Sequence, residues 1–187
     1  AQADVLGIFG REGVAIAALD GLPADGALGE DAFKLYRSFD GAGAKFGTTS
    51  VRTVSDDEMV SAFASVEGDR VLVVLINKDS VQSQPADVAL SALSQLPSSG
   101  TYRAFAFNAA QRLGPSGTGS FTGGHLVRVL PPWSAEIVEL SPAGWDGGYE
   151  YVDAGSPPVP DAGQPVEDGG VQPDGGTIDA GTIDAGM

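Results

Sequence analysis

The chain has 187 residues, of which 42% are hydrophobic, and a formal net charge of −15 at pH 7. An acidic protein repels phosphate backbones, which argues against a nucleic-acid partner. The sequence has no cysteine, which excludes disulfides and thiolate zinc sites, and it has no run of about 18 apolar residues that would span a membrane.

The first 45 residues alternate between helical and strand-like patterns. Residues 3–9 place apolar side chains near helical spacing, and residues 14–19 form an unbroken apolar run, typical of a strand buried on both faces. Residues 32–39 are amphipathic and follow the acids Glu30 and Asp31, which favour a helix N-terminus. The order helix, buried strand, loop and helix is typical of the last part of a β/α barrel or of a doubly wound sheet.

The next region, residues 46–140, alternates short apolar runs with turn signals, which indicates a β-sandwich or barrel. The apolar run at residues 71–76 is our candidate for the central strand, and the glycine-rich stretch at residues 114–119 is interpreted as a turn. The predicted strands are Thr48–Val54, Met59–Val66, Arg70–Asn77, Asp87–Leu90, Tyr102–Asn108, His125–Leu130 and Glu136–Leu140.

The last region, residues 141–187, differs from the rest in charge and composition. It holds nine acids and no base, a net −9, whereas residues 1–140 hold 16 acids and 10 bases, a net −6. It is rich in Gly, Pro, Asp and Ala, and Gly-Thr-Ile-Asp-Ala occurs at residues 176–180 and again at 181–185. Low hydrophobicity with one sign of charge does not offset the entropy cost of ordering. We therefore predict a disordered acidic linker, which could attach the protein to a cell surface.

Several motifs occur in a specific order along the first two regions. They are Ala3-Asp-Val-Leu-Gly-Ile-Phe-Gly-Arg-Glu-Gly-Val14, Ala32-Phe-Lys-Leu-Tyr-Arg-Ser-Phe-Asp-Gly41, Lys45-Phe-Gly47 and Thr49-Ser-Val51, followed by the less specific Val74-Leu-Ile-Asn-Lys78 and Leu130-Pro-Pro-Trp-Ser134. Together they resemble glycoside hydrolase family 44, a family of endoglucanases and xyloglucanases.

The resemblance implies a mainly β fold, with an antiparallel β-sandwich over residues 46–140. The sandwich would be preceded by the last helix, strand and helix of a (β/α)8 barrel, residues 1–45, and followed by the disordered tail, residues 141–187. It further implies the C-terminal part of a secreted glycoside hydrolase acting on β-1,4-glucans, in which the sandwich supports the barrel. Polysaccharide is then the partner, and no cofactor is needed.

The resemblance also implies that the catalytic residues are not in this chain. Retaining glycosidases use two carboxylates about 5 Å apart, and the family carries them after the fourth and seventh barrel strands, upstream of Ala1. We therefore assign no catalytic residue and expect the chain alone to be inactive. The acids Asp56, Asp57 and Glu58 are interpreted as a solvated turn, and Glu136 and Glu139 should face opposite sides of a strand.

Two residues are candidates for substrate binding. Asp20 follows the predicted strand at residues 14–19, where the family carries a tryptophan that stacks on a sugar, and the alternative is a turn residue before Gly21. Trp133 begins an aromatic cluster with Trp145, Tyr149 and Tyr151, which could form a carbohydrate-binding face or could pack a domain edge.

No metal site is assigned, since His125 is the only histidine and has no partner set of ligands in the sequence.

Two other functions stay open at this point: a stand-alone carbohydrate-binding module and a cell-surface stalk. A further expectation concerns solubility. Without the rest of a barrel, five apolar side chains should be exposed and should promote aggregation. They are Ile8, Phe9, Ile16, Phe33 and Tyr36.

Overall fold

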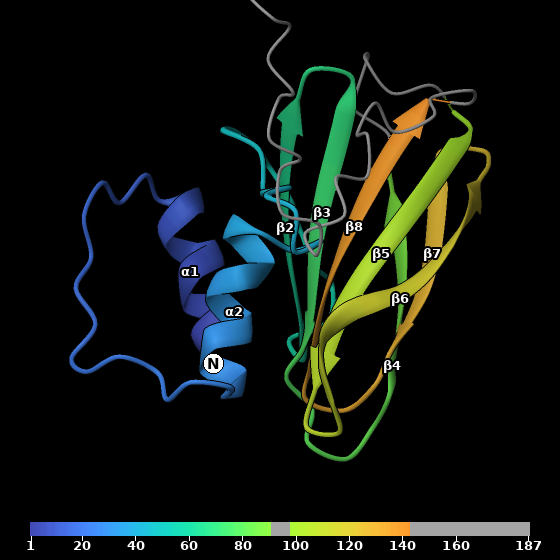
Figure 1. The fold of residues 1–187 in the computed structure, drawn as a ribbon. Helices are drawn as coiled ribbons and strands as arrows, with labels where there is room; N and C mark the ends of the chain where they lie inside the picture. The colour runs from blue at the N-terminus through green and yellow to red at the C-terminus, as the bar shows by residue number, and fades with distance from the viewer. Residues whose placement is uncertain (91–97, 143–187) are drawn as a thin grey trace, which may run out of the picture. The chain divides into compact units, whose positions relative to one another are not determined.

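The computed structural model describes residues 1–90 and 98–142, which form two helices and eight strands (Figure 1). The helices are α1 (Gln2–Arg11) and α2 (Leu28–Arg37), and the strands are β1 (Thr49–Val51), β2 (Val60–Glu67), β3 (Arg70–Asn77), β4 (Gln84–Ala89), β5 (Gly100–Asn108), β6 (Gln111–Phe121), β7 (His125–Leu130) and β8 (Ser134–Pro142). Neither helix is long and apolar enough to cross a membrane.

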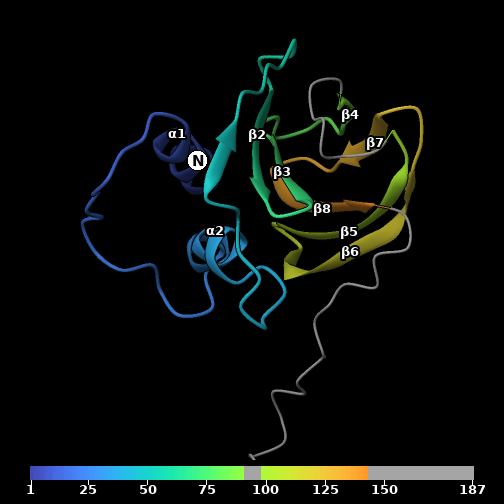
Figure 2. The same ribbon diagram turned by 90° about the horizontal axis from the view of Figure 1, so that it is seen from above.

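The strands form two antiparallel sheets. The larger has six strands in the order β1-β2-β3-β8-β5-β6, and the smaller pairs β4 with β7. The two helices cover one face of the large sheet, and the small sheet lies against its other face (Figure 2). The prediction of a mainly β antiparallel sandwich preceded by helices is confirmed.

Strands β3 and β8 form the middle of the large sheet, and nearly all of their residues are buried on both faces. They pair from Val71↔Leu140 to Asn77↔Ser134, which confirms residues 71–76 as the central strand. Since side chains alternate along a strand, the pair supplies two separate cores. The core under the small sheet includes Val71, Val73, Leu75, Val138 and Leu140, and the core under the helices includes Leu72, Val74, Ile76 and Ile137.

The helices pack on the sheet through small and apolar residues. Leu35 of α2 is fully buried, and the Tyr36 hydroxyl donates to the carbonyl of Ala3 at 3.0 Å, which ties α2 to α1. Gly7 of α1 lies against the ring of Phe63 on β2, so closely that an added Cβ would come within 2.4 Å of it. Only glycine permits this approach of helix to sheet.

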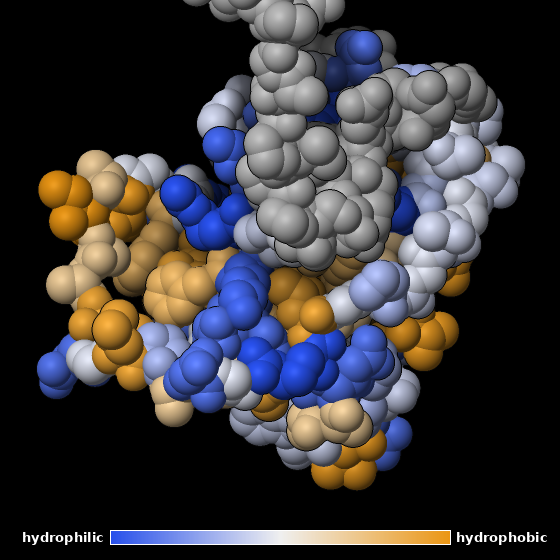
Figure 3. Space-filling model, in the orientation of Figure 1, coloured by the Kyte–Doolittle hydropathy of each residue, from blue (hydrophilic) through white to orange (hydrophobic). Residues whose placement is uncertain are grey.

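The strand predicted for residues 14–19 is not formed. These residues lie in the loop between α1 and α2, and the exposed fractions of Val14, Ile16, Leu19 and Leu22, here called the apolar strip, are 44%, 90%, 49% and 95%. A barrel strand needs hydrogen-bonded neighbours on both sides, and no strand in the described part of the chain pairs with this one. Figure 3 shows hydrophobic side chains on the side of the molecule where this loop runs.

The expected exposure of five apolar side chains holds for Ile16 alone. Because α1 and α2 pack on each other and on the sheet, the other four are half-buried; they are Ile8, Phe9, Phe33 and Tyr36.

Strand β6 was not predicted, since its glycines at residues 114–119 were interpreted as a turn. In the structure these glycines lie within the strand and make room for larger side chains of other strands. A Cβ at Gly119 would come within 3.0 Å of the Tyr102 ring on β5, and Gly117 adopts a φ of 155° beside the Arg128 guanidinium. The prediction of a turn here is wrong because the strand provides space for its neighbours.

The predicted linker lies largely outside the described residues. Strand β8 extends to Pro142, and residues 143–187 are beyond the part of the chain that the structure describes. The aromatic cluster predicted around Trp145 lies there too, apart from Trp133.

Candidate functional site

Asp20 lies in an exposed bend, beside Gly21 with its φ of 83°. This backbone conformation favours glycine, so the local geometry is that of the turn considered as the alternative. The described residues bring no other candidate side chain to Asp20. Its role toward a substrate stays a prediction.

Trp133 occupies the turn between β7 and β8 and has an exposed fraction of 56%. Its backbone N–H donates to the carbonyl of Asp79 at 2.8 Å, and its φ is 49°. This is the left-handed region, which a bulky side chain rarely adopts. Trp133 is therefore not a core residue of the described structure, and its role in a carbohydrate-binding face or at a domain edge stays a prediction.

Hydrogen bonds from buried side chains fix the conformation of this turn. The side-chain amide of Asn77, buried at the end of β3, donates to the carbonyls of Gln82, Leu130 and Pro131 at 2.9, 3.1 and 2.9 Å. The Ser134 hydroxyl donates to the Pro131 carbonyl at 2.7 Å. A buried amide with three acceptors specifies one backbone geometry, because unmade hydrogen bonds would be costly there.

The carboxylate of one residue, Asp79, holds the loop beside Trp133 in place through hydrogen bonds. Asp79 accepts the N–H groups of Val81 and Gln82 at 2.8 and 2.9 Å. The hydrogen bond from Gln82, and then that from Val81, lowers the pKa of the Asp79 carboxyl, because both stabilise its charged form.

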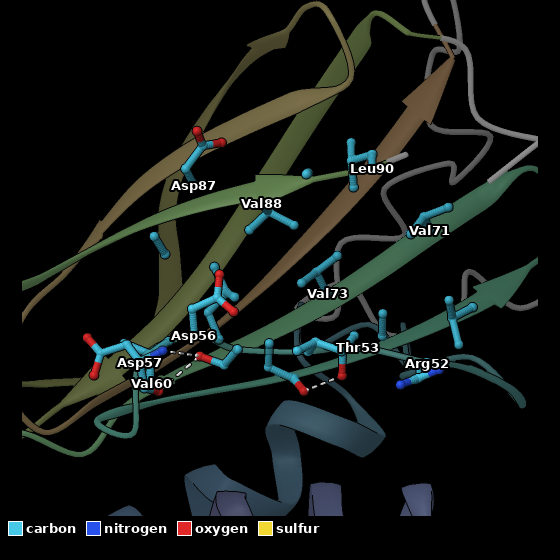
Figure 4. Close-up of a pocket in the computed structure, with 18 of the residues that line it drawn as sticks. Arg52, Thr53, Asp56, Asp57, Val60, Val71, Val73, Asp87, Val88 and Leu90 are labelled. Carbon is cyan, nitrogen blue, oxygen red and sulfur yellow. Dashed lines mark hydrogen bonds between the residues drawn. The ribbon is translucent and has the colours of Figure 1, made fainter. Parts of the chain in front are cut away.

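A cavity of about 460 Å³ opens between β4 and the segment at residues 51–57 (Figure 4). Its floor is apolar, and it arises because the small sheet covers only part of the large sheet. The carboxylates of Asp56, Asp57 and Asp87 stand at its rim and are exposed. Asp57 accepts the N–H of Met59 at 2.8 Å, which confirms the predicted turn.

Two acids on β8 are buried on opposite faces, as their spacing predicts. On the small-sheet side, Glu136 accepts from Arg128 at 2.6 and 2.9 Å and from the Ser116 hydroxyl at 2.7 Å. On the helix side, Glu139 accepts from Arg70 at 2.7 Å and from Arg103. The hydrogen bond to Glu136 raises the pKa of Arg128, because it stabilises the charged guanidinium.

A third buried acid joins a helix to the sheet. Both oxygens of Asp31 in α2 accept from Arg112 at the start of β6, the Nη2 contact measuring 2.8 Å. Asp31 and Glu30 were predicted only as a helix start, which the structure confirms. The clasp by Arg112 could not be predicted, since β6 itself was missed.

His125 is exposed and pairs with Asp87 on the neighbouring strand, Nδ1 to Oδ1 at 2.9 Å. Within residues 1–90 and 98–142, no three histidine or acidic side chains converge where a metal ion could bind.

Curated proteins similar to this chain are polysaccharide-degrading enzymes. Endoglucanase A of Paenibacillus lautus is 35% identical over 106 residues, which cover 54% of this chain and 14% of that protein. The β-mannanase/endoglucanase A of Caldicellulosiruptor saccharolyticus is 40% identical over 83 residues, or 42% of this chain and 6% of that protein. No family model matches the chain.

Solved structures match over more of the chain. They are the bifunctional glucanase-xylanase CelM2 from a metagenome library (TM-score 0.70, 33% identity, 76% of this chain), the family 44 endoglucanase Cel44A of Clostridium thermocellum (0.68, 27%, 75%) and a family 44 xyloglucanase of Paenibacillus polymyxa (0.65, 28%, 75%). The chain spans only 27–28% of the length of these three proteins.

Proposed function

We propose that this chain, which carries the C-terminal sandwich segment of glycoside hydrolase family 44, supports the catalytic barrel of a secreted β-1,4-glucan hydrolase. In this proposal the sandwich and its two helices form the base of the enzyme. The substrate is a cellulose-like or xyloglucan-like polysaccharide, and the two catalytic carboxylates belong to the remainder of the parent protein.

The observation that carries the proposal is the structural likeness to enzymes that are several times longer. The chain aligns over about three quarters of its length with a family 44 endoglucanase and a family 44 xyloglucanase, yet it covers 28% of each. A segment of this size accounts for the sandwich and a small part of a barrel. The activities named for those proteins therefore belong to polypeptides that contain much more than this segment.

The chemistry of the described residues supports a non-catalytic role. A retaining glycosidase needs two carboxyl groups about 5 Å apart, one of them free to exchange a proton. The buried carboxylates among residues 1–90 and 98–142 are those of Asp31, Glu136 and Glu139, and each is bonded to arginine. Both oxygens of each of these carboxylates accept hydrogen bonds from arginine, so none of the three is free to exchange a proton with a substrate.

The exposure of the apolar strip supports the proposal that these side chains pack against another part of the parent protein. Ile16 and Leu22 have exposed fractions of 90% and 95%, and Val14 and Leu19 lie between and beside them with nearly half of their surface exposed. A contiguous exposed apolar segment marks an interaction surface. In the parent enzyme, residues 14–19 would then form a barrel strand with neighbours on both sides, as the apolar run predicts.

Two further elements of the proposal concern the substrate and location. Asp20 follows the strip and would stand at the end of that barrel strand, where barrels bind substrate. In the complete enzyme, Asp20→Ala should raise the KM for xyloglucan, and an unchanged KM would remove Asp20 from the binding site.

Secretion follows from the extracellular nature of the substrate, and the acidic tail would provide attachment to the cell surface.

Hydrolysis assays test the proposal. Reducing-sugar release from carboxymethylcellulose and xyloglucan would be measured for the 187-residue chain and for the parent protein. We expect release by the parent protein alone. Hydrolysis by the 187-residue chain would place a catalytic pair within it and overturn the supporting role, and inactivity of both would refute the assignment to an active hydrolase.

A further inference from the structure

The turn between β7 and β8 holds an aromatic ring at the surface in a backbone conformation that ordinarily belongs to glycine. Among the described residues, Trp133 is the one non-glycine residue with a positive φ, and its exposed fraction is 56%. Strained backbone persists where the surroundings enforce it, and such positions concentrate at binding and catalytic sites. Burial of the ring cannot be the reason for the strain, because the ring is exposed.

The surroundings do enforce the conformation. The Trp133 N–H donates to the Asp79 carbonyl at 2.8 Å, and Asn77 donates to the Pro131 carbonyl two residues before Trp133 at 2.9 Å. Asn77 and Ser134 are both buried. The tryptophan therefore stands on a rigid support, so little conformational entropy would be lost when a ligand covers its ring.

The groups around Trp133 are mostly polar and exposed. Beyond the last register pair of β3 and β8, Asn77↔Ser134, come Lys78 on one side and Trp133 on the other. Lys78 is exposed, and the adjoining loop adds exposed hydroxyl and amide groups. These are Ser80, Gln82 and Ser83. One aromatic plane bordered by hydrogen-bonding groups differs from the apolar strip, which offers aliphatic surface alone.

We propose that Trp133 is the centre of a second polysaccharide-binding site, on the sandwich itself, that binds a β-1,4-linked glucan chain. The hydroxyl groups of such a sugar are equatorial, which leaves the flat faces of the ring lined with C–H groups. These pack on the negative face of an indole ring, while Lys78 and Ser80 hydrogen-bond to hydroxyls at the sugar's edge. The inference rests on the proposed function for the identity of the polymer. It adds to that function a contact that holds substrate away from the catalytic centre.

Affinity electrophoresis of the 187-residue chain in gels containing xyloglucan or hydroxyethylcellulose tests this site. We expect the wild-type chain to be retarded, and Trp133→Ala to weaken binding at least tenfold. Trp133→Tyr, which keeps an aromatic plane, should retain most of the retardation. Val127→Ala, which shortens another exposed hydrophobic side chain (64% exposed, on β7), is the control and should migrate as wild type. Thermal melting verifies that each variant folds.

A second readout isolates the ring itself. In Trp145→Phe, Trp133 is the single fluorescent tryptophan, and addition of xyloglucan oligosaccharides should change its emission intensity and shift its maximum. A wild-type chain without retardation, equal retardation of Trp133→Ala, or an emission spectrum unchanged by saturating oligosaccharide would each overturn the site.

The test separates this inference from the proposed function. If the parent protein hydrolyses xyloglucan while Trp133→Ala leaves retardation unchanged, the second site fails and the supporting role stands. If the chain is retarded but the parent protein is inactive, the site stands and the hydrolase fails. If Trp133→Ala lowers the melting temperature of the parent protein without affecting retardation, the ring is a contact within the enzyme, and the second site fails.

Discussion

Arg112 on β6 grips both carboxylate oxygens of Asp31 on α2, although 81 residues separate them in the sequence. The same guanidinium donates to the Gly26 carbonyl and, at 3.3 Å, to Glu30. The hydrogen bond to the Asp31 carboxylate raises the pKa of Arg112, because it stabilises the charged guanidinium. This contact fastens the first turn of the helix to the edge strand of the large sheet.

Loss of the Arg112 side chain should destabilise the chain measurably. Arg112→Ala leaves the Asp31 carboxylate buried without its main partner, and we expect a loss of about 1–3 kcal/mol in the free energy of unfolding. Arg112→Lys should recover only part of this, since an ammonium group cannot make the two-pronged contact. Arg52→Ala, at an exposed position, is the control and should change stability by less than about 0.5 kcal/mol. Urea unfolding measures all three, and equal midpoints would contradict the structural role of the contact.

Glu139 should be the most sensitive acid of the sandwich. Its side chain is fully buried, and Arg70 and Arg103 converge on it. Glu139→Gln removes the charge that both guanidinium groups require, and we expect a loss of about 3 kcal/mol. Glu58→Gln, in the exposed turn before β2, is the matched control and should be neutral. A neutral effect of Glu139→Gln in the same denaturation experiment would mean that the arginines find water or other partners.

The loop that supports Trp133 should respond to acid. The hydrogen bonds from the Gln82 and Val81 N–H groups hold the pKa of Asp79 below its ordinary value of 3.8. A carboxyl group whose pKa is depressed by folding stabilises the native state above its unfolded pKa, and this contribution is lost as the pH falls through the native value. Asp79→Asn should therefore lower the melting temperature at pH 7, and the difference from wild type should shrink as the pH falls below 3.8 and through the lowered native pKa. A difference that is independent of pH would contradict this origin.

The sequence patterns predicted the large sheet well because its middle strands are unambiguous. The apolar run in β3 depends on burial alone, and residue types indicate burial directly. The same holds for the alternation in β7 of the small sheet. Strand β4 begins three residues earlier than the predicted Asp87, at Gln84, and includes Pro85. A proline is tolerated in this two-stranded sheet, where each strand has a free edge.

Strand β6 was missed because glycine has two uses. Glycine is common in turns, which is why residues 114–119 were assigned to one. Gly117 and Gly119 instead lie in a strand, where the missing side chain leaves room for Arg128 and Tyr102. One signal could have revealed it: without β6, the 16 residues between Asn108 and His125 would be a long structureless loop, which is uncommon in a compact domain.

The candidate sites were harder to predict than the fold. The exposure of Trp133 depends on a turn held by Asn77, which lies more than 50 residues earlier in the chain. Local patterns carry no information about such a contact. The buried pairs of Glu136 and Glu139 likewise depend on which arginines the neighbouring strands bring into reach.

The most direct test of the supporting role compares one substitution in two settings. Ile16→Asp is made in the 187-residue chain and in the parent protein, and the free energy of unfolding is measured for both, with Val81→Asp, at another exposed position, as the control. Ile16 is 90% exposed here, so we expect a change below about 0.5 kcal/mol in the chain. In the parent protein, where the barrel would bury Ile16, we expect a loss of several kcal/mol. An equally small change in both settings would contradict the packing of the apolar strip against a barrel and, with it, the supporting role.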